Sequence, residues 1–543
     1  MDIRLEILPR GGQAKELRQK DNEWSNKYFA ISIGAMMAIT VVFHWISLIC
    51  FQYGRGKDNA FMSRLATYQR KFQCLLSRRI VGTSIDRIIL YGLYWSINLI
   101  LVLTNVELTS LTYVAKRFGW ITLANFVLLV FLALRNTPLA PLSANSYEKL
   151  RPLHKVAGYT CIFASGNLQS MLETEQIAGV VAGIAMLIIA ASTVPFVYRG
   201  YYEVFYLTHL VMFLLILITA AMHRPKFSKS AVIIIIFTAC LWSTDRLIRF
   251  LKICWNFPGN HATLTALPDG AIRVRLSRPV RATAGSHSFL WIPAIRLVET
   301  HPFTMLATDP PEFIIRVHDG FTRDLWRYAS KTSGEHEKEK KLRCSIDGGY
   351  GQVLDFKKFD RVVLIAGGSG ASFTFAVAMD LIRKESGVKC IDFIWVVRSK
   401  DALSWYDDEL RQLQPDPRVN LRIYVTRSAM AMEQAEIHPL SSPDVSDSDP
   451  SSPIAEFTIY DVEKGGAPGT TSEKLPSPIS LHQGRPQISD LITDIVSNTG
   501  SNDCIAIGAC GPSNLVDRAR EAIRKHGYDN GPSITLYSEE FRW

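Results

Sequence analysis

Hydrophobic and polar residues follow different patterns in the two halves of the chain. The first half contains apolar runs that begin near Phe29, Ile88, Gly119, Leu153, Ile177, Val204 and Ala231. Each run is long enough to cross the ~30 Å hydrocarbon layer of a bilayer as a helix. The second half alternates short apolar stretches with polar turns, as soluble domains do. The pattern predicts a multi-pass α-helical membrane bundle of seven spans over residues 29–253, followed by a large soluble half.

Basic residues predict the membrane topology. The loop from Phe51 to Arg87 holds eight Lys or Arg residues against two Asp residues, which favours the cytoplasm. Seven alternating spans then make residues 1–28 an extracytoplasmic tail and place the soluble half in the cytoplasm. One span more or fewer would invert this arrangement, and the six basic residues of the tail favour such an inversion. No cleavable signal peptide is predicted, because the tail lacks a short apolar core.

The formal net charge of +10 does not predict nucleic-acid binding. Much of the excess lies in loops beside the apolar spans, where membrane lipid is the expected partner. The nine cysteines show no paired spacing typical of a zinc site or a disulfide framework, so free thiols are expected.

Two histidines lie in the apolar run from Val204 to His223. His209 and His223 are about 21 Å apart along a helix and on nearly the same face. An ionisable side chain inside lipid indicates a functional site. His154, at the start of the fourth span, has the same predicted depth as His209. Two neutral imidazoles from facing helices give six-coordinate haem iron, so we predict a haem between His154 and His209.

The alternative for this pair is two buried histidines bonded to neighbouring carbonyl groups. Gly158, one turn after His154, leaves room for a porphyrin edge. Arg151 and Lys155 are candidates for contact with haem propionates, or equally for snorkelling to the interface. His44, in the first span, has no histidine at matching depth and is assigned a structural role.

His223 lacks a matching histidine. Its partner should lie about fourteen residues beyond His154, where the sequence runs from Gly166 to Met171 without one. A second haem would need an unusual ligand such as Met171, would be held by His223 alone, or would be absent.

The soluble half begins with alternating stretches that predict an antiparallel β-barrel over residues 258–356. One four-residue motif consists of His301, Pro302, Phe303 and Thr304. Its proline fixes the backbone, its phenylalanine ring can pack on a flat heterocycle, and its threonine hydroxyl can form a hydrogen bond to that heterocycle. Gly320 and Thr322 open a predicted helix, whose free amides suit a diphosphate. Together the two motifs predict bound FAD.

A dinucleotide-binding α/β domain is predicted over residues 360–543. A strand, a glycine turn and a helix follow one another, and the turn consists of Gly367, Gly368, Ser369 and Gly370. Phe373 stands where the third glycine of the usual fingerprint would be. The next strand ends at Arg398, which is placed to bind a ribose 2′-phosphate and so favours NADPH over NADH, although a surface arginine after a strand is also common.

The end of the chain supplies the predicted catalytic residues. A late strand leads to Cys510, Gly511 and Pro512, and the carboxyl end of such a strand borders the ligand crevice. The closing residues bring Phe541 to the same place. Between them, residues 428–482 are rich in Ser, Pro, Asp and Gly, which predicts a disordered insertion.

In their order and spacing these motifs resemble the fungal ferric/cupric-chelate reductase family, relatives of the NADPH oxidases, from about Ile88 to Trp543. The matching segments are HPFT at 301–304, GFT at 320–322, GGYG at 348–351 where the family has GPYG, GGSG at 367–370, VVR at 396–398, GRP at 484–486, CGP at 510–512 and the final EEFRW. The resemblance adds Arg485 to the cofactor-binding residues. It implies a ferredoxin-reductase-like module of barrel and α/β domain, and two b haems held by His154, His209 and His223.

The resemblance implies a plasma-membrane metalloreductase. Hydride would pass from cytosolic NADPH to FAD beside Cys510, and single electrons would then pass through haem to ferric or cupric chelates. The alternatives are a superoxide-releasing oxidase, a redox partner that passes electrons to another protein in a biosynthetic pathway, and a non-catalytic membrane component.

Overall fold

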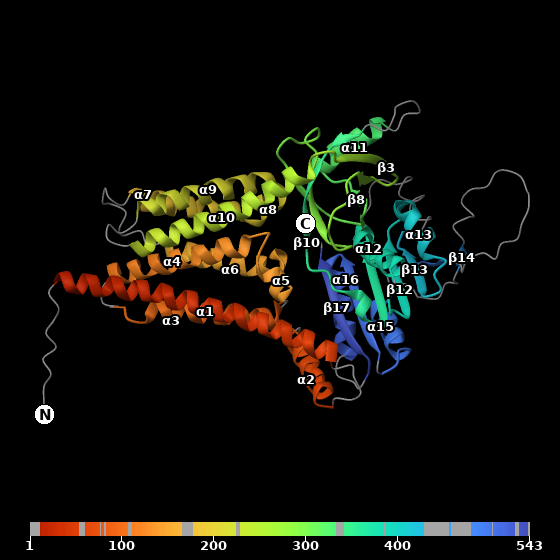
Figure 1. Ribbon diagram of the computed structural model, residues 1–543, viewed down its shortest axis with the longest axis horizontal. Coiled ribbons are helices and arrows are strands. Elements are labelled where there is room, and N and C mark those ends of the chain that lie inside the picture. Colours follow the sequence, from red (N-terminus) through yellow and green to blue (C-terminus); the bar gives the residue numbers. More distant parts are fainter. Residues whose placement is uncertain are drawn as a thin grey trace, which may run out of the picture. The chain divides into compact units, whose positions relative to one another are not determined.

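The computed structural model divides the chain into two compact units, residues 1–249 and 250–543 (Figure 1). It describes residues 11–53, 60–76, 78–80, 83–106, 111–165, 177–223, 229–332, 341–384, 386–427, 455–457, 479–501, 503–526 and 531–540. Most of the predicted insertion, the segment that includes Met171, and Phe541 lie outside these ranges.

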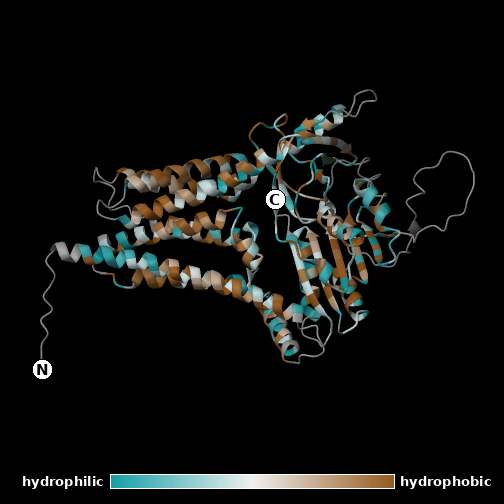
Figure 2. Cartoon of the chain, viewed as in Figure 1, coloured by the Kyte–Doolittle hydropathy of each residue, from teal (hydrophilic) through white to brown (hydrophobic). Residues whose placement is uncertain are grey.

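The first unit is a helical bundle. Its helices are α1 (Gly11–Tyr53), α2 (Ala60–Leu76), α3 (Ile85–Leu103), α4 (Leu111–Ala133), α5 (Leu139–Ser143), α6 (Tyr147–Ser165), α7 (Ile177–Ser192), α8 (Pro195–Gly200), α9 (Tyr202–Met222) and α10 (Lys229–Asn256), with a small hairpin of β1 (Arg79–Ile80) and β2 (Thr83–Ser84). A long helix lies at each of the seven predicted runs. Figure 2 shows apolar residues along these helices.

Five described helices are long and apolar enough to cross a membrane: α1, α3, α4, α9 and α10. The other two predicted spans, α6 and α7, do not meet this criterion. Helix α7 is apolar but has only 16 residues, and α6 carries charged residues in its first turns. The count of seven spans therefore stays a prediction.

Helix α4 packs at the centre of the bundle core. Phe29, Tyr94, Leu128 and Ala157, from α1, α3, α4 and α6, belong to one buried cluster. Polar groups also pair inside the bundle, since the Tyr94 hydroxyl donates to Asn125 Oδ1 at 2.8 Å. These contacts fix α6 against α4 and so position the start of α6, where His154 lies.

The second unit begins with two antiparallel sheets, in orders β10-β5-β6 and β7-β8-β4-β3-β9, that form the predicted barrel. The strands are β3 (His261–Leu267), β4 (Ala271–Leu276), β5 (His287–Trp291), β6 (His301–Thr304), β7 (Ala307–Thr308), β8 (Pro311–Arg316), β9 (Leu342–Arg343) and β10 (Ser345–Tyr350). Helix α11 (Phe321–Thr332) follows β8, and its Phe321 and Leu325 complete the apolar core between the sheets.

The last turn of α10 is hydrogen-bonded to strand β10. Ser345 Oγ donates to the Ile253 carbonyl at 2.7 Å, and Asn256 Nδ2 donates to the Ile346 carbonyl at 2.9 Å. Lys252 Nζ reaches the Tyr350 hydroxyl at 3.4 Å. The end of this helix is therefore part of the barrel's own hydrogen-bond network.

The α/β domain is built on a seven-stranded sheet of order β14-β15-β13-β12-β11-β16-β17, parallel except for β14. Its strands are β11 (Arg361–Gly367), β12 (Cys390–Val397), β13 (Val419–Val425), β14 (Ala455–Phe457), β15 (Ile479–Gln483), β16 (Cys504–Gly511) and β17 (Ser533–Glu540). Helices α15 (Ile488–Ser497) and α16 (Ser513–His526) pack on one face. On the other, α12 (Ala371–Arg383) packs Phe375 on Phe393 of β12 at 4.6 Å, beside α13 (Asp407–Leu413). Short 3₁₀ turns are η3 (Phe356–Lys358), η4 (Gly368–Gly370) and η5 (Lys400–Tyr406).

The predicted disordered insertion extends too far. Residues 479–482 belong to β15, which pairs in parallel with β13, and residues 455–457 form β14 beside it. The prediction is wrong at these positions because the polar composition of the surrounding segment hid a short alternating strand.

Candidate functional site

His154 and His209 face each other inside the bundle. Their ring centroids are 6.4 Å apart, with ring planes inclined by 52°. His154 Nδ1 lies 3.0 Å from the Leu129 carbonyl of α4. A carbonyl accepts only, so Nδ1 carries the proton and Nε2 keeps a lone pair. The structure thus brings together the two residues that the sequence paired by depth.

This pair fits the axial ligation of a haem iron. If both rings bound one metal ion, each metal–nitrogen bond would be about 2 Å and each nitrogen would lie about 1 Å from its ring centre, so the two ring centroids would be roughly 6 Å apart. The observed distance between the centroids is 6.4 Å. A ligating histidine usually donates its other N–H to a carbonyl, as His154 does. The Nδ1 atom of His209 is buried and has no hydrogen-bond partner among the described residues. A Cβ at position 158 would have Leu129 Cδ2, 3.9 Å away, as its nearest neighbour, so the side of the helix at Gly158 is open.

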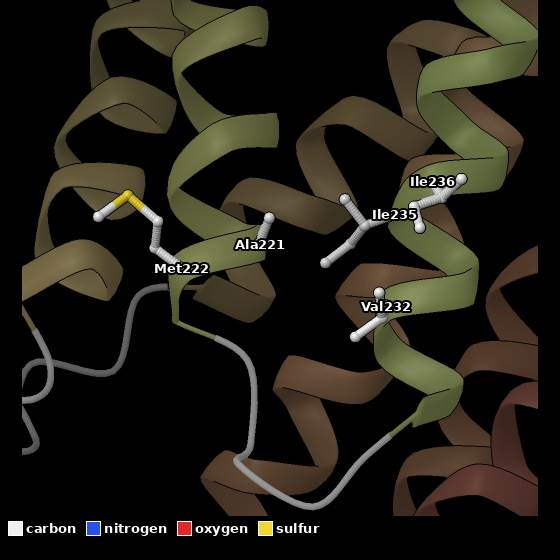
Figure 3. A pocket seen from close by; sticks show the side chains of 5 residues that line it. All are labelled: Ala221, Met222, Val232, Ile235 and Ile236. Atoms are coloured by element: carbon white, nitrogen blue, oxygen red, sulfur yellow. The ribbon is translucent and has the colours of Figure 1, made fainter.

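His223 caps the carboxyl end of α9 and is exposed. Its imidazole lies against α7, since a Cβ on Gly179 would come within 2.9 Å of His223 Cε1. Beside it, a cavity of about 480 Å³ opens between the ends of α9 and α10 (Figure 3), and its lining residues are Ala221, Met222, Val232, Ile235 and Ile236. Four of these side chains offer only apolar contact, and the Met222 thioether is the one possible metal ligand among the five.

The remaining charged candidates near the pair lie toward the surface. Lys155 Nζ sits 5.0 Å from the centroid of the Tyr198 ring, and Arg151 is exposed. His44 lies on α1 and is half-buried. Among the residues that the structure describes, no group of three or more His, Cys, Asp or Glu side chains could hold a metal ion.

The predicted FAD motifs meet on the three-stranded sheet. Across it, Gly348 of β10 pairs with Ser288 of β5, which pairs with Phe303 of β6. This row places the GGYG segment, β5 and the HPFT segment side by side. His301 stacks on Phe321, the first residue of α11, at 4.4 Å and 17°. The start of α11, with Gly320 before it, therefore borders the HPFT strand as well.

Thr322 bonds within its own turn. Its hydroxyl accepts from the His318 N–H at 2.8 Å and donates to the His318 carbonyl at 3.0 Å. The N–H groups of Arg323 and Asp324 donate to the Gly320 carbonyl at 3.1 and 3.2 Å. The donors that remain for a diphosphate at this helix start are the amides of Phe321 and Thr322, which have no acceptor inside the helix. Pro302 and Thr304 are half-buried in β6, and Thr304 pairs with His287.

The glycine turn lies at the switch point of the parallel sheet. Chain order runs from β11 outward through β12 on one side and through β16 on the other, and ligands bind at the carboxyl ends of such strands. Gly370 must be glycine here, because a Cβ would come within 2.5 Å of the Cys510 carbonyl oxygen. The turn is also held by Trp395, whose Nε1 donates to the Gly368 carbonyl at 3.2 Å. Ser369 lies in the middle of the same turn. A Cβ on Gly367 would come within 2.7 Å of Pro512 Cδ, so Pro512 packs directly against the start of the turn.

Phe373 explains the missing third glycine. Its ring is fully buried and stacks on Tyr537 of β17 at 5.3 Å. It also fills the space beside Gly285, where a Cβ would lie 2.9 Å from Phe373 Cδ2. Gly285 precedes β5, so this aromatic ring joins the helix of the dinucleotide turn to the flavin-binding sheet.

Three arginines follow adjacent parallel strands. Arg398 follows β12, Arg427 follows β13 and Arg485 follows β15, and all three are exposed. The Arg427 N–H donates to the Arg398 carbonyl at 3.0 Å, which holds the first two together. Arg427 was not predicted as a binding residue, although its position two residues beyond a strand was a usable signal.

Cys510 is fully buried at the end of β16. Burial, together with the nearby Glu539 carboxylate, raises the pKa of its thiol well above the ordinary value. The Sγ atom therefore stays protonated at neutral pH. All cysteines whose side chains the structure describes are free, as predicted. Phe541, the second predicted catalytic residue, lies outside the described residues.

Arg273 joins the barrel to the α/β domain. From β4 it donates to Glu312 of β8 at 3.1 Å, and with both terminal nitrogens to Glu409 of α13 at 3.1 and 2.9 Å. Both carboxylates are almost fully buried. Burial raises the pKa of Glu409 even though the Arg273 guanidinium opposes that shift. We call Arg273, Glu312 and Glu409 the interdomain clamp.

Three family models match this chain. Ferric reductase like transmembrane component matches residues 118–166, FAD-binding domain matches residues 256–354, and Ferric reductase NAD binding domain matches residues 359–524.

Curated relatives include three fungal proteins. Ferric/cupric reductase transmembrane component 2 of Saccharomyces cerevisiae is 28% identical over 462 residues, covering 79% of this chain and 61% of the relative. Ferric reductase transmembrane component 5 of the same yeast is 23% identical, covering 96% of this chain and 79% of the relative. Probable cell surface ferric reductase kap2 of Aspergillus oryzae is 26% identical, covering 58% and 47%. This chain thus spans less than two thirds of the first and third of these relatives.

Matches among solved structures include two proteins solved with bound FAD. A flavohemoglobin from Malassezia yamatoensis is 14% identical, with a TM-score of 0.38, covering 79% of this chain and 95% of that chain. A ferredoxin NADP+ reductase from Neisseria gonorrhoeae is 14% identical, with a TM-score of 0.33, covering 51% and 97%.

The family models follow one another in the order of the bundle, the barrel and the α/β domain, and the relatives are fungal membrane reductases. The chain therefore belongs to the ferric/cupric reductase transmembrane component family.

Proposed function

We propose that this chain is a membrane oxidoreductase that passes electrons from NADPH, through FAD and haem, to ferric or cupric chelates. The observation that carries the proposal is the opposed pair His154 and His209, in a chain that also has a flavin-binding and a dinucleotide-binding domain. When bound, these cofactors supply the conversion of a two-electron hydride donor into one-electron steps.

The chain's own residues supply position and charge. His154 and His209 would hold the haem iron from facing helices, with the Leu129 carbonyl setting the tautomer of His154. The amides at the start of α11 and the glycine turn at Gly368 would bind the two diphosphates. Cys510 keeps its proton on Sγ and offers no competing thiolate at the crevice.

Haem ligation can be tested on the purified full-length protein. His154→Ala and His209→Ala should each remove the bis-histidine absorption spectrum and lower chelate reduction at least tenfold. FAD content and NADPH-dependent reduction of a soluble dye should stay within twofold, because the soluble half is unchanged. His44→Ala, in the same bundle but outside the pair, is the matched control. Full haem content and an unchanged spectrum in both variants would contradict the assignment.

Preference for NADPH is assigned to Arg398 and Arg427. A charge-assisted hydrogen bond contributes roughly 1.5–3 kcal/mol, so Arg398→Gln or Arg427→Gln should raise the KM for NADPH about tenfold or more. The KM for NADH, which lacks the 2′-phosphate, should not change. Arg524→Gln, an exposed arginine on α16, serves as control. Equal changes with both nucleotides would exclude 2′-phosphate binding by these arginines.

A further inference from the structure

Helix α1 is polar at its start and apolar at its end. Six charged residues lie in the segment from Glu16 to Lys27, and the apolar run follows from about Phe29 to Cys50. At 1.5 Å per residue this run is about 33 Å long, close to the ~30 Å thickness of the hydrocarbon layer. Large apolar side chains stay exposed in the last turns of the helix, among them Trp45 (50%), Ile46 (42%) and Ile49 (46%). The last turns of α1 are therefore suited to lipid near one membrane surface.

Helix α2 folds back against these turns. Gln69 Nε2 donates to Ser47 Oγ at 2.6 Å, and Gln73 Nε2 reaches the same oxygen at 3.2 Å. Phe72 packs edge-on against Phe43 at 5.9 Å. These contacts make the end of α1 and α2 a helical hairpin, in which Phe72 stays 49% exposed beside its contact with Phe43.

A second side of α2 is an exposed apolar stripe. At spacings of four and three residues, which keep side chains on one helix face, its members are Phe61 (72% exposed), Leu65 (36%), Tyr68 (71%), Phe72 (49%) and Leu75 (44%). A soluble helix would direct such a stripe into a core. Here it lies next to the apolar surface of α1.

A third side of α2 is basic. Arg64 and Lys71 are exposed and seven residues apart, so they lie on the same face, beside the apolar stripe. Arg78 continues the spacing just beyond the helix. The sequence contains no Asp or Glu between residues 59 and 85, so this face carries positive charge without acidic neighbours along the chain.

We propose that helix α2, packed on the last turns of α1, lies in the headgroup layer of the membrane and binds anionic phospholipids. The apolar stripe would face the acyl chains, and Arg64 and Lys71 would contact lipid phosphates, as in interfacial amphipathic helices. Charge complementarity selects this occupant. A second copy of the same face would oppose like charges, and α1, on which α2 packs, is a candidate membrane span. The inference rests on the membrane insertion in the proposed function, but not on any redox step.

Hydrogen exchange in nanodiscs tests the proposal on the full-length protein. Discs of phosphatidylcholine alone are compared with discs that also contain phosphatidylserine. Each basic residue near an anionic surface contributes about fivefold in binding, so amide exchange in residues 60–76 should slow markedly in anionic discs, by up to ~25-fold. Arg64→Gln with Lys71→Gln should abolish this lipid dependence, and Arg64→Glu with Lys71→Glu should reverse it. Arg524→Gln with Lys525→Gln, on α16, removes the same charge elsewhere and should leave it intact.

Two results would overturn the proposal. Equal exchange of residues 60–76 in both discs would show that anionic lipid does not bind there. Protection that depends on protein concentration but not on lipid charge would assign the stripe to a protein partner. Haem absorbance and NADPH oxidation, measured on the same discs, report the proposed function separately, since the glutamine variants leave all cofactor-binding residues unchanged.

Discussion

Gly349 has a backbone conformation that excludes proline. Proline is the residue at this position in the GPYG segment of the ferric reductase family. The φ of Gly349 is +85°, whereas a proline ring fixes φ near −65°. Its N–H also donates to Ser288 Oγ at 3.2 Å, a bond that proline cannot make. A proline at position 349 would therefore require a different local structure from the one that the GGYG segment adopts here.

Replacing this glycine should weaken the flavin-binding domain in a graded way. Gly349→Ala keeps the N–H, and its Cβ would meet the Arg281 carbonyl oxygen only at 3.4 Å. We expect a cost of about 1–2 kcal/mol for the left-handed conformation alone. Gly349→Pro should cost more and lower the FAD content of the purified protein. Flavin-to-protein ratio and melting temperature measure both effects. A proline variant as stable as the parent would show that the turn adopts another conformation.

The residues of the candidate site could be predicted where a sequence motif, or equal depth in the membrane, pointed to them. His154 and His209 were paired from their positions in two spans, and the structure places their rings together. Leu129 was not predictable, because it acts through its backbone carbonyl, which any residue offers. Arg427 was missed because only the sheet order, not the local sequence, brings it beside Arg398.

Asp380 links helix α12 to the turn that precedes the sheet. Its carboxylate bonds Lys357 of η3 at 2.7 Å and Lys384 at 2.6 Å. Burial alone would raise the pKa of Asp380, but these lysines outweigh it and lower the pKa below its ordinary value.

The stability of the soluble half should therefore fall in acid. A carboxyl whose pKa is lower in the folded state stabilises the fold above its unfolded pKa of about 3.9 and loses that contribution as pH falls through the folded value. Asp380→Asn should lower the free energy of unfolding at pH 7 by about 1 kcal/mol or less, because the pair is partly exposed. Thermal release of FAD at pH 7 and near pH 3 would measure this. The difference between parent and variant should be smaller at the lower pH; a constant difference would contradict the linkage.

Helices and strands were predicted best where a single hydrophobic periodicity continued over many residues. The long helices of the bundle and the strands beside the glycine turns appear where apolar patterns indicated them. Helix α2 was predicted only as a basic loop, because its apolar residues occupy a narrow stripe between polar ones. Strand β15 was absorbed into a segment of polar composition, and only its pairing with β13 identifies it.

The interdomain clamp should control how the two soluble domains act together. Glu409→Gln removes the charge that reaches Arg273 across the boundary, whereas Glu312→Gln removes an equally buried charge within the barrel. We expect Glu409→Gln to slow flavin reduction by NADPH about tenfold, equivalent to ~1.4 kcal/mol, at unchanged FAD content. Glu312→Gln should lower the melting temperature but keep the reduction rate within twofold.

Stopped-flow flavin reduction distinguishes these cases. Asp408 also pairs with Arg273, at 3.5 Å, but it is 68% exposed, so Asp408→Asn should leave the rate within twofold and the stability within about 1 kcal/mol. Equal slowing by the Glu312 and Glu409 variants would mean that the clamp stabilises the fold without positioning the domains. The sequence could not predict this contact, because Arg273 and Glu409 are 136 residues apart and neither belongs to a motif.

The hydrogen bonds between the end of α10 and β10 also determine where a fragment that contains the two soluble domains should begin. Residues 250–256 belong by sequence to a membrane helix, but their carbonyl and amide groups pair with Ser345 and Ile346. A soluble fragment that starts at residue 258 would sever both bonds, whereas one that starts at Phe250 retains them. Chimeras that exchange reductase modules between family members should therefore place the crossover inside the helix, ahead of its final two turns.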